Sequence, residues 1–216
     1  MIQLNNISKS FGNLQVLKNI DLQITKGEIV SITGASGAGK TTLLNIMGTL
    51  DRADSGQVLI NNKDVGSMSD KEISIFRNKH IGFVFQFHNL LAEFSAMENT
   101  ILPALIYNDN KQEAIKKANE LFAILGIEDK KEAYPNELSG GEQQRVAIVR
   151  SLINSPSIVL ADEPTGNLDS VNARSLFDLF FLLREKLNQT FVVVTHAKEL
   201  SDLCDRQLVI KDGKII

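Results

Sequence analysis

Residues 34–41 read GASGAGKT and match the phosphate-binding pattern G-x-x-x-x-G-K-S/T at every fixed position. Glycines let such a loop curl until its backbone N–H groups point at phosphate oxygens, and the N-terminus of the next helix adds about half a positive charge. We expect Lys40 to reach the β- and γ-phosphates of a nucleotide and the Thr41 hydroxyl to ligate Mg²⁺. The predicted phosphate-binding residues are Gly34, Ala35, Ser36, Gly37, Ala38, Gly39, Lys40, Thr41 and Thr42, the last of which could equally be an ordinary threonine at a helix start.

Two carboxylates follow a short apolar run much later in the chain. Residues 157–161 read SIVLA and lead directly into Asp162 and Glu163. In open parallel sheets, ligands bind at the edge where the strands end. Asp162 is therefore expected to hold Mg²⁺ through water, as a Walker B aspartate. Because side chains alternate along a strand, we expect Glu163 to point the other way and to act as the general base for an attacking water, a role worth about 10²–10⁴ in rate.

A second helix start with room for an anion lies at residues 138–145, which read LSGGEQQR. Ser139 fits a helix N-cap, and Glu142, three residues later, completes a capping box. Gly140 and Gly141 leave the backbone amides bare, so an anion can approach closely. One nucleotide does not need two such helix ends, and we infer that this one serves a nucleotide held by another copy of the chain.

The elements that must position these residues follow from hydrophobic periodicity. Apolar patterns predict strands at residues 2–8, 17–25, 28–33, 57–60, 81–86, 157–161 and 191–195, and a closing hairpin of 207–210 and 214–216. Helices are predicted at 40–50, 69–77, 111–125, 141–154 and 171–187, with Gly126 as a C-terminal cap. Alternating buried strands and helices predict an α/β fold with a parallel sheet covered on both faces, an antiparallel piece at the N-terminus and a helical insert in the middle.

Composition removes several classes of protein. The 216 residues include 23 Lys and Arg against 26 Asp and Glu, a net charge of −3 that lacks the basic footprint of a nucleic-acid binder. The chain has one cysteine, Cys204, which favours a reducing compartment, and no stretch long and apolar enough for a membrane span or a signal peptide. His80 and His88 have no ligand-like spacing, so we expect no metal other than Mg²⁺.

Together these motifs resemble the ATP-binding cassette (ABC) ATPases over essentially the whole chain. The resemblance implies one domain, 1–216, with a P-loop NTPase (RecA-like) parallel-sheet core, an N-terminal antiparallel β subdomain and a helical subdomain inserted at roughly 87–155. It also implies an ATP-dependent homodimer, a head-to-tail nucleotide sandwich with two composite sites. In that dimer Ser139, Gly140, Gly141 and Gln143 would bind the ATP held by the Walker A loop of the other copy.

The same resemblance assigns roles to further residues. Phe11, where the family more often has tyrosine, would stack on adenine, although a phenylalanine there could also be a core residue. Val16 would pack on the ribose or base. Gln86 matches the Q-loop glutamine, which contacts Mg²⁺ and water, and His196 matches the switch histidine that bonds the γ-phosphate. Residues 167–169 resemble the D-loop, which crosses the dimer seam.

The stretch after Gln86 indicates a branch of the family. Residues 85–99 read FQFHNLLAEFSAMEN and resemble the lipoprotein-releasing branch, LolD, while ADEPTGNLD at 161–169 fits the wider group of LolD, MacB and FtsE. Ala92 departs from a proline common in the LolD branch. MacB-like efflux and FtsE-like regulation of cell division remain the alternatives, the latter as a scaffold that binds ATP rather than turning it over.

The implied partners are integral membrane permease subunits of the LolC/LolE kind, which would hold the chain at the cytoplasmic face of the inner membrane without direct membrane contact. The same stretch predicts an apolar docking patch for these subunits, made of Phe87, Leu90, Leu91 and Phe94, although half of them could be core residues. The cargo is not encoded in these motifs.

Overall fold

A six-stranded sheet forms the centre of the structure, a computed structural model that describes residues 2–107, 110–166 and 168–216, without the side chain of Ser170. The strands lie in the order β10, β9, β3, β8, β7, β6. From β9 to β6 neighbouring strands run parallel, and β10 pairs antiparallel with β9. Their bounds are β3 (Ile29–Gly34), β6 (Ile81–Phe85), β7 (Ile158–Asp162), β8 (Phe191–Val194), β9 (Arg206–Lys211) and β10 (Lys214–Ile215). The expected parallel sheet and closing hairpin are confirmed.

Both faces of this sheet are buried, which explains why its strands read as continuous apolar runs. Val159 and Ala161 of β7 belong to the core on one face, and Ile158 and Leu160 belong to the core on the other. Strand β8 divides its valines in the same way. Two hydrophobic cores therefore hold the central sheet in place, one against helices and one against a second sheet.

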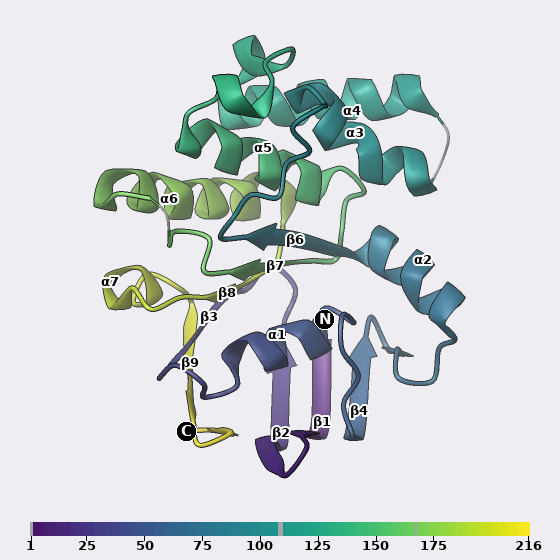
Figure 1. Cartoon of the computed structure of the whole chain (residues 1–216), viewed down its shortest axis with the longest axis vertical. Coiled ribbons are helices and arrows are strands. Elements are labelled where there is room, and N and C mark those ends of the chain that lie inside the picture. Colours follow the sequence, from purple (N-terminus) through teal and green to yellow (C-terminus); the bar gives the residue numbers. More distant parts are fainter. Residues whose placement is uncertain (1, 108–109, 167) are drawn as a thin grey trace.

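The second sheet is antiparallel, as the N-terminal pattern predicts, and it has four strands in the order β2, β1, β4, β5. Helix α1 (Lys40–Met47) lies between the two sheets (Figure 1) and buries Leu43, Leu44 and Met47 completely. It ends before the predicted residue 50, at Gly48, where a Cβ would lie 2.6 Å from the ring of Phe83. The strands are β1 (Ile2–Phe11), β2 (Leu14–Ile24), β4 (Ser55–Ile60) and β5 (Lys63–Asp64).

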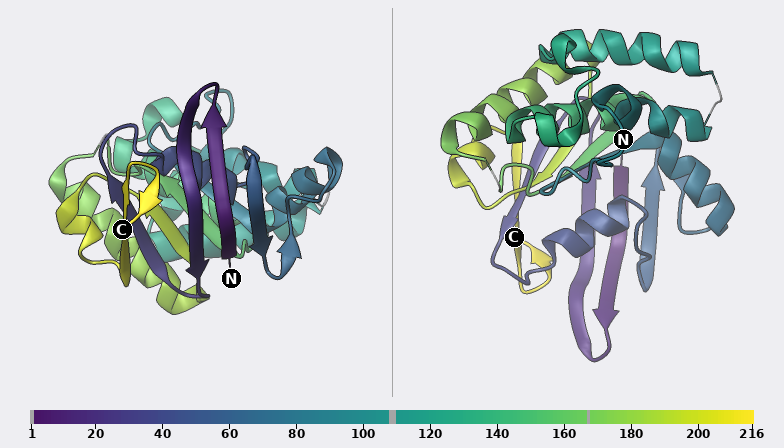
Figure 2. Two further views of the ribbon diagram at one scale, coloured as in Figure 1. Left: turned by 90° about the horizontal axis from the view of Figure 1, so that it is seen from below. Right: turned by 45° about the horizontal axis from the view of Figure 1, so that its top comes forward.

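Helices cover the other face of the central sheet, as Figure 2 shows from two further sides. Every described element between β6 and β7 is helical. None of the described helices combines the length and apolarity needed to cross a bilayer. The helices are α2 (Asp70–His80), α3 (Ala96–Tyr107), α4 (Lys111–Leu125), α5 (Gly140–Leu152), α6 (Ser170–Leu187) and α7 (Lys198–Ser201), with 3₁₀ turns at Glu128–Lys130 and Pro135–Glu137.

Candidate active site

The loop between β3 and α1 requires glycine at two positions. Gly34 has φ 147° and Gly39 has φ 105°, both in the region that favours glycine. A Cβ at Gly34 would lie 2.2 Å from the carbonyl oxygen of Ile210, and a Cβ at Gly39 would lie 2.8 Å from Leu17 Cδ2. The loop is thus held tightly at both ends, while residues 35–37 between them are exposed. This leaves the loop backbone open to a ligand.

The start of α1 suits an anion. Gly39 is its N-cap and supplies no side-chain cap, so the first backbone amides of the helix are free of side-chain acceptors. The Lys40 side chain, 6% exposed, donates from Nζ to the carbonyl oxygens of Gly34 at 3.1 Å and Ala35 at 3.0 Å. Among the described residues this ammonium forms no ion pair, so an incoming phosphate would not have to displace a carboxylate from it. These residues therefore fit a nucleotide phosphate; Thr41 and Thr42 are the next residues of the helix.

A cavity of about 520 Å³ adjoins the loop and is lined by residues 14–16 and 18, loop residues 34–38, and residues 209–213 of the C-terminal hairpin. Val16 is brought to the loop, since its carbonyl oxygen would lie 3.1 Å from a Cβ at Gly39. The sequence predicts the Asp212–Gly213 turn but not its place here. That place follows from the pairing of Gly34 with Ile210, a contact between segments far apart in the chain.

Phe11 is the last residue of β1 and stands at the tip of the β1–β2 hairpin. Its ring is 52% exposed, with Lys9 Nζ 5.3 Å from the ring centroid. The core alternative for this phenylalanine is therefore wrong, and its ring face is available for stacking.

Thr41 and Asp162 meet across the end of β7, where Thr41 Oγ1 donates to Asp162 Oδ1 at 3.4 Å. Burial raises the pKa of the Asp162 carboxyl, and the Thr41 bond and the charge of Lys40 oppose the rise. Within the described ranges no group of three or more His, Cys, Asp or Glu residues could hold a metal. One carboxylate and one hydroxyl fit a hard cation that takes its remaining ligands from water and phosphate, as Mg²⁺ does.

Glu163 and His196 form a second pair beside the first, with His196 Nε2 3.0 Å from Glu163 Oε1. Burial raises the pKa of Glu163, opposed by His196, and the nearby charge of Asp162 raises it further. A carboxylate with a raised pKa is a stronger base. The alternation of side chains along a strand does not set the direction of Glu163, because β7 already ends at Asp162. Glu163 has a left-handed φ of 48°, so the turn after the strand sets the direction of its side chain.

Gln86 follows β6 and reaches the same edge. A Cβ on Gly166 would lie 2.6 Å from Gln86 Nε2, which puts the glutamine amide beside the turn that follows Glu163. Because β3, β8, β7 and β6 are parallel neighbours, their ends converge. One edge of the sheet therefore gathers the phosphate loop, Asp162, Glu163, His196 and Gln86.

The Ser139–Gly141 corner lies elsewhere, at the start of α5 in the upper helical layer of Figure 1. Ser139 and Glu142 form the predicted capping box, in which Ser139 N and Oγ both donate to Glu142 Oε2 at 2.8 Å. Ser139 and Gly140 are exposed. In the part of the chain that the structure describes, no hydrogen bond or ion pair joins residues 139–141 to the phosphate loop. One chain does not bring the two helix starts together.

Gln143 has its side chain engaged within the chain. Its Nε2 donates to the carbonyl oxygens of Pro135 at 2.9 Å and Leu138 at 3.1 Å, and its Oε1 lies 3.2 Å from His88 Nδ1. In the D-loop, Asn167 lies outside the described residues, and Asp169 caps α6 by accepting from Asn172 N at 2.8 Å. No local pattern predicts the His88–Gln143 contact, because it joins residues 55 positions apart.

Residues 17–166 match the ABC transporter family. The chain belongs to this family of ATPases. It is 58% identical to the lipoprotein-releasing system ATP-binding protein LolD of Bacteroides thetaiotaomicron over 100% of this chain and 99% of that protein. It is 56% identical to the protein of the same name from Cytophaga hutchinsonii, with the same coverage. The family resemblance and its lipoprotein-releasing branch are confirmed, and this ABC ATPase is an ATP-binding subunit of a transporter.

Solved structures agree with the fold. The ATP-binding cassette MJ0796, described as dimeric in a post-hydrolysis state and bound to ADP and Pi, superposes with a TM-score of 0.87 and 39% identity over 100% of this chain and 96% of that one. CbiO1 from Clostridium perfringens, part of the ABC transporter complex cbiONQ, gives a TM-score of 0.92 and 29% identity, covering 100% of this chain and 86% of that one. The ABC ATPase fold, and with it a site for ATP and ADP, is confirmed for this chain.

Proposed function

We propose that this ABC ATPase powers the release of lipoproteins from the inner membrane, as the ATP-hydrolysing subunit of a complex whose other subunits span that membrane. The observation that carries the proposal is full-length identity of 56–58% to proteins named for lipoprotein release, in a chain whose sheet edge gathers the groups that hydrolysis needs. We place it at the cytoplasmic face, as one domain, 1–216, with helical residues 87–155 inserted.

In this proposal each residue of the sheet edge has a role. The loop amides and Lys40 bind the triphosphate, with Thr42 as a further contact, and Phe11 and Val16 pack against the base and ribose. Thr41 and Asp162 hold Mg²⁺, with Gln86 nearby; the ion supplies positive charge against the phosphate oxygens. Glu163 takes a proton from the attacking water, while His196, 3.0 Å away, orients that carboxylate and contacts the γ-phosphate.

The start of α5 supports a head-to-tail homodimer. Ser139 and Gly140 at this helix start are exposed, as are residues 35–37 of the phosphate loop, and no hydrogen bond or ion pair among the described residues joins the two. Two copies related by a twofold axis would satisfy both, each placing Ser139, Gly140 and Gly141 over the nucleotide of the other. Both N–H groups of the Gln143 amide donate within the chain, so we assign the direct trans contacts to the other three residues.

The membrane partner has a candidate docking surface next to Gln86. Residues 87–94, here called the docking segment, expose Phe87 (68%), Leu91 and Phe94, whereas Leu90 packs into the core. A groove of about 630 Å³ lies between α2, β6, α3 and α5, and its lining includes Ile75, Phe83, Pro103, Ile106, Tyr107 and Arg150. Because Arg150 of this groove also bonds the backbone of residues 88 and 89, the groove adjoins the docking segment, and the two together suit an amphipathic helix of a permease subunit.

The test of this mechanism is Glu163→Gln, assayed with Mg²⁺ and ATP. We expect hydrolysis to fall by about 10³-fold or more, because the amide cannot accept the proton, while ATP-bound dimers accumulate in size-exclusion chromatography. The contrasting variant is Lys40→Ala, which should bind ATP too weakly to dimerise. If Glu163→Gln stays monomeric at saturating ATP, the composite site is wrong.

The cargo is tested with the permease subunits in proteoliposomes. Turnover that rises when a lipoprotein is present supports release, whereas ATP binding with negligible turnover in that complex would instead support a nucleotide-gated regulator.

A further inference from the structure

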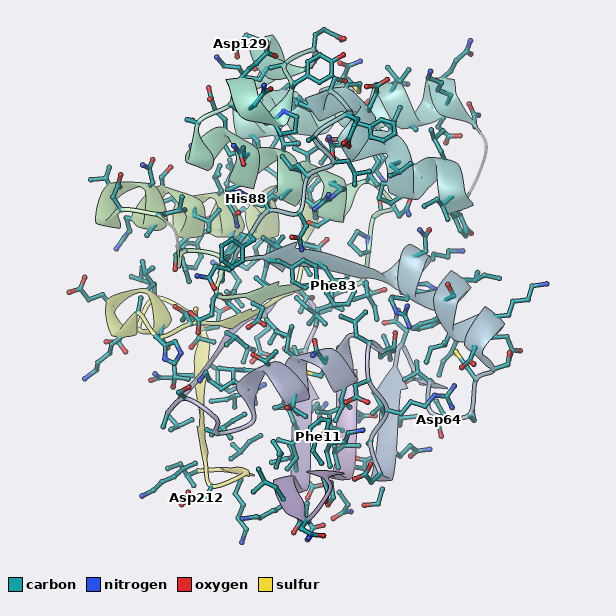
Figure 3. The ribbon with its side chains drawn as sticks, viewed as in Figure 1. Phe11, Asp64, Phe83, His88, Asp129 and Asp212 are labelled. Atoms are coloured by element: carbon teal, nitrogen blue, oxygen red, sulfur yellow. The ribbon has the colours of Figure 1, made fainter. Side chains whose placement is uncertain are left out.

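Helix α5 contacts the docking segment through two side chains on one of its faces. Gln143 and Arg150 are separated by about 10 Å along the helix axis, two turns of the same face. Arg150 donates from Nη2 to the carbonyl oxygen of His88 and from Nη1 to that of Asn89 at 2.6 and 2.7 Å. Gln143 Oε1 meets the His88 ring at 3.2 Å. His88, next to the helices in Figure 3, is therefore held by its backbone and its side chain.

The direction of the His88–Gln143 bond follows from the other partners of the amide. Gln143 Nε2 donates to two carbonyl oxygens, so the oxygen of the amide must face His88. Burial lowers the pKa of His88, which favours the neutral ring, and Nδ1 is then the donor. A single helix face thus gives the segment three hydrogen bonds whose polarity is fixed.

Helix α3 holds the other end of the segment. Asn99 is 1% exposed, and its Oδ1 accepts from Leu91 N at 2.8 Å. Its Nδ2 donates to the carbonyl oxygens of Leu91 at 3.0 Å and Phe94 at 2.9 Å. Hydrogen bonds from α3 and α5 therefore hold the backbone of the segment, while its exposed apolar side chains point away from these two helices.

We propose that Arg150 and the His88–Gln143 pair form a clamp that makes the docking segment and the Ser139 end of α5 move as one unit. Arg150 is a positioning residue in this arrangement: it also lines the groove, and its part in the clamp is to fix the backbone that carries Phe87 and Leu91. The inference rests on the proposed head-to-tail dimer. Because Ser139 closes on the nucleotide of the opposite copy, a permease subunit docked on one copy acts through the clamp on its partner's nucleotide.

The guanidinium group suits this task. Its planar fork reaches two successive carbonyl oxygens from two separate nitrogens in a fixed geometry. Arg150→Met keeps the apolar stem of the side chain and removes both bonds, and it leaves the β3–α1 loop untouched. Arg184→Met is the matched control, because Arg184 also donates two hydrogen bonds, to Asp205, but lies at the end of α6 away from the segment.

The experiment measures ATP turnover of the complex with its permease subunits and of the chain alone. We expect Arg150→Met to lower the permease-stimulated kcat about tenfold while KM for ATP changes less than about twofold, because cis binding is intact. Arg184→Met should change neither value. Hydrogen exchange of the Glu163→Gln chain adds a readout without turnover: ATP should slow exchange at residues 88–91 and 140–145 together, and adding Arg150→Met should leave only the second change.

Normal stimulation of the Arg150→Met complex, or an equal fall in Arg184→Met, would overturn the clamp while leaving the proposed function intact. The clamp would likewise be overturned if hydrogen exchange at residues 88–91 were equally fast with and without ATP in Glu163→Gln dimers. Failure of Glu163→Gln to dimerise at all would overturn the proposed function, and the trans action of the clamp with it.

Discussion

Helices α2 and α5 begin with the same capping box. In α2, Ser69 N and Oγ donate to Glu72 Oε2 at 2.9 and 2.6 Å, and Glu72 N donates back to Ser69 Oγ at 3.4 Å. In α5 the matching distances for Ser139 and Glu142 are 2.8, 2.8 and 3.4 Å. The local geometry of the cap is therefore equal at the two helix starts, and the cap alone does not distinguish structure from function.

The two residues after the serine make the difference. In α2 they are Asp70 and Lys71, and the Asp70 carboxylate, which pairs with Arg52 at 2.9 Å, already supplies negative charge to the helix end. In α5 they are Gly140 and Gly141, and a Cβ built on Gly140 meets nothing within 4 Å. The first helical position of α2 thus carries a carboxylate, whereas that of α5 has no side chain and leaves room for an anion from outside. In the proposed dimer, the glycines after the cap, rather than the cap itself, distinguish the helix start that meets a nucleotide.

Gly140→Asp makes the start of α5 resemble that of α2, and of the variants that compare the two helix starts it should lower turnover most. The carboxylate would sit where a triphosphate from the other copy must approach, so we expect turnover and ATP-driven dimerisation to fall by about 100-fold or more. The fold should lose nothing: Gly140 is not left-handed, and an acidic residue in the first turn stabilises a helix by about 0.3–1 kcal/mol. ATPase assays and thermal unfolding of the same sample measure both effects.

The reciprocal variant, Asp70→Gly, is the control: it should unfold at a slightly lower temperature with unchanged turnover. A Gly140→Asp protein that hydrolyses ATP normally would mean that the open start of α5 has no ligand.

Helices with a clear stripe and a clear end could be predicted from sequence, and others could not. Helix α4 buries Ala114, Ala118 and Leu125 on one stripe and ends at Gly126 with φ 64°. Helix α3 was missed because Pro103 lies inside it and apolar residues surround it, which removes the periodic signal. The short β5 and α7 were also missed, because two and four residues carry too little pattern.

The members of the sheet edge could be predicted, but not their contacts. Each of Asp162, Gln86 and His196 ends an apolar run, which marks the edge of a parallel sheet. The Glu163–His196 pair needs β7 and β8 to be neighbours and Glu163 to turn left-handed, neither of which leaves a local trace in the sequence. The order of strands is a long-range property, so only the folded chain reveals which strand ends meet.

Replacing the serines of the two boxes sharpens the comparison with an effect of intermediate size. Ser139→Ala and Ser69→Ala each remove one cap, and each should lower the unfolding midpoint by about 2–4 °C. Only Ser139→Ala should also weaken ATP-driven dimerisation, by about tenfold, because in the proposed dimer the Ser139 hydroxyl turns from Glu142 to the γ-phosphate held by the opposite copy. Equal ATP-driven dimerisation of both variants would mean that Ser139, like Ser69, only caps its helix.

The pH dependence of turnover and of stability distinguishes the carboxylate at the sheet edge from those of the two caps, and it is the smallest of the expected effects. The Glu163 carboxyl faces His196, Asp162 and Lys40, and burial raises its pKa above the ordinary 4.5. As the pH drops through this raised pKa, the carboxylate is protonated and can no longer act as the base, so turnover falls. Bonds from Ser139 and Ser69 lower the pKa of Glu142 and of Glu72 below 4.5, so the stability that these carboxylates add is complete above 4.5 and is lost only at lower pH. Turnover at saturating ATP should therefore decline at a pH where the difference in unfolding midpoint between the wild type and Ser139→Ala or Ser69→Ala is still constant, and Glu163→Gln should keep its ATP-bound dimer throughout that range. A joint decline of turnover and of this difference, both below 4.5, would assign the acid limb to the caps instead of to Glu163.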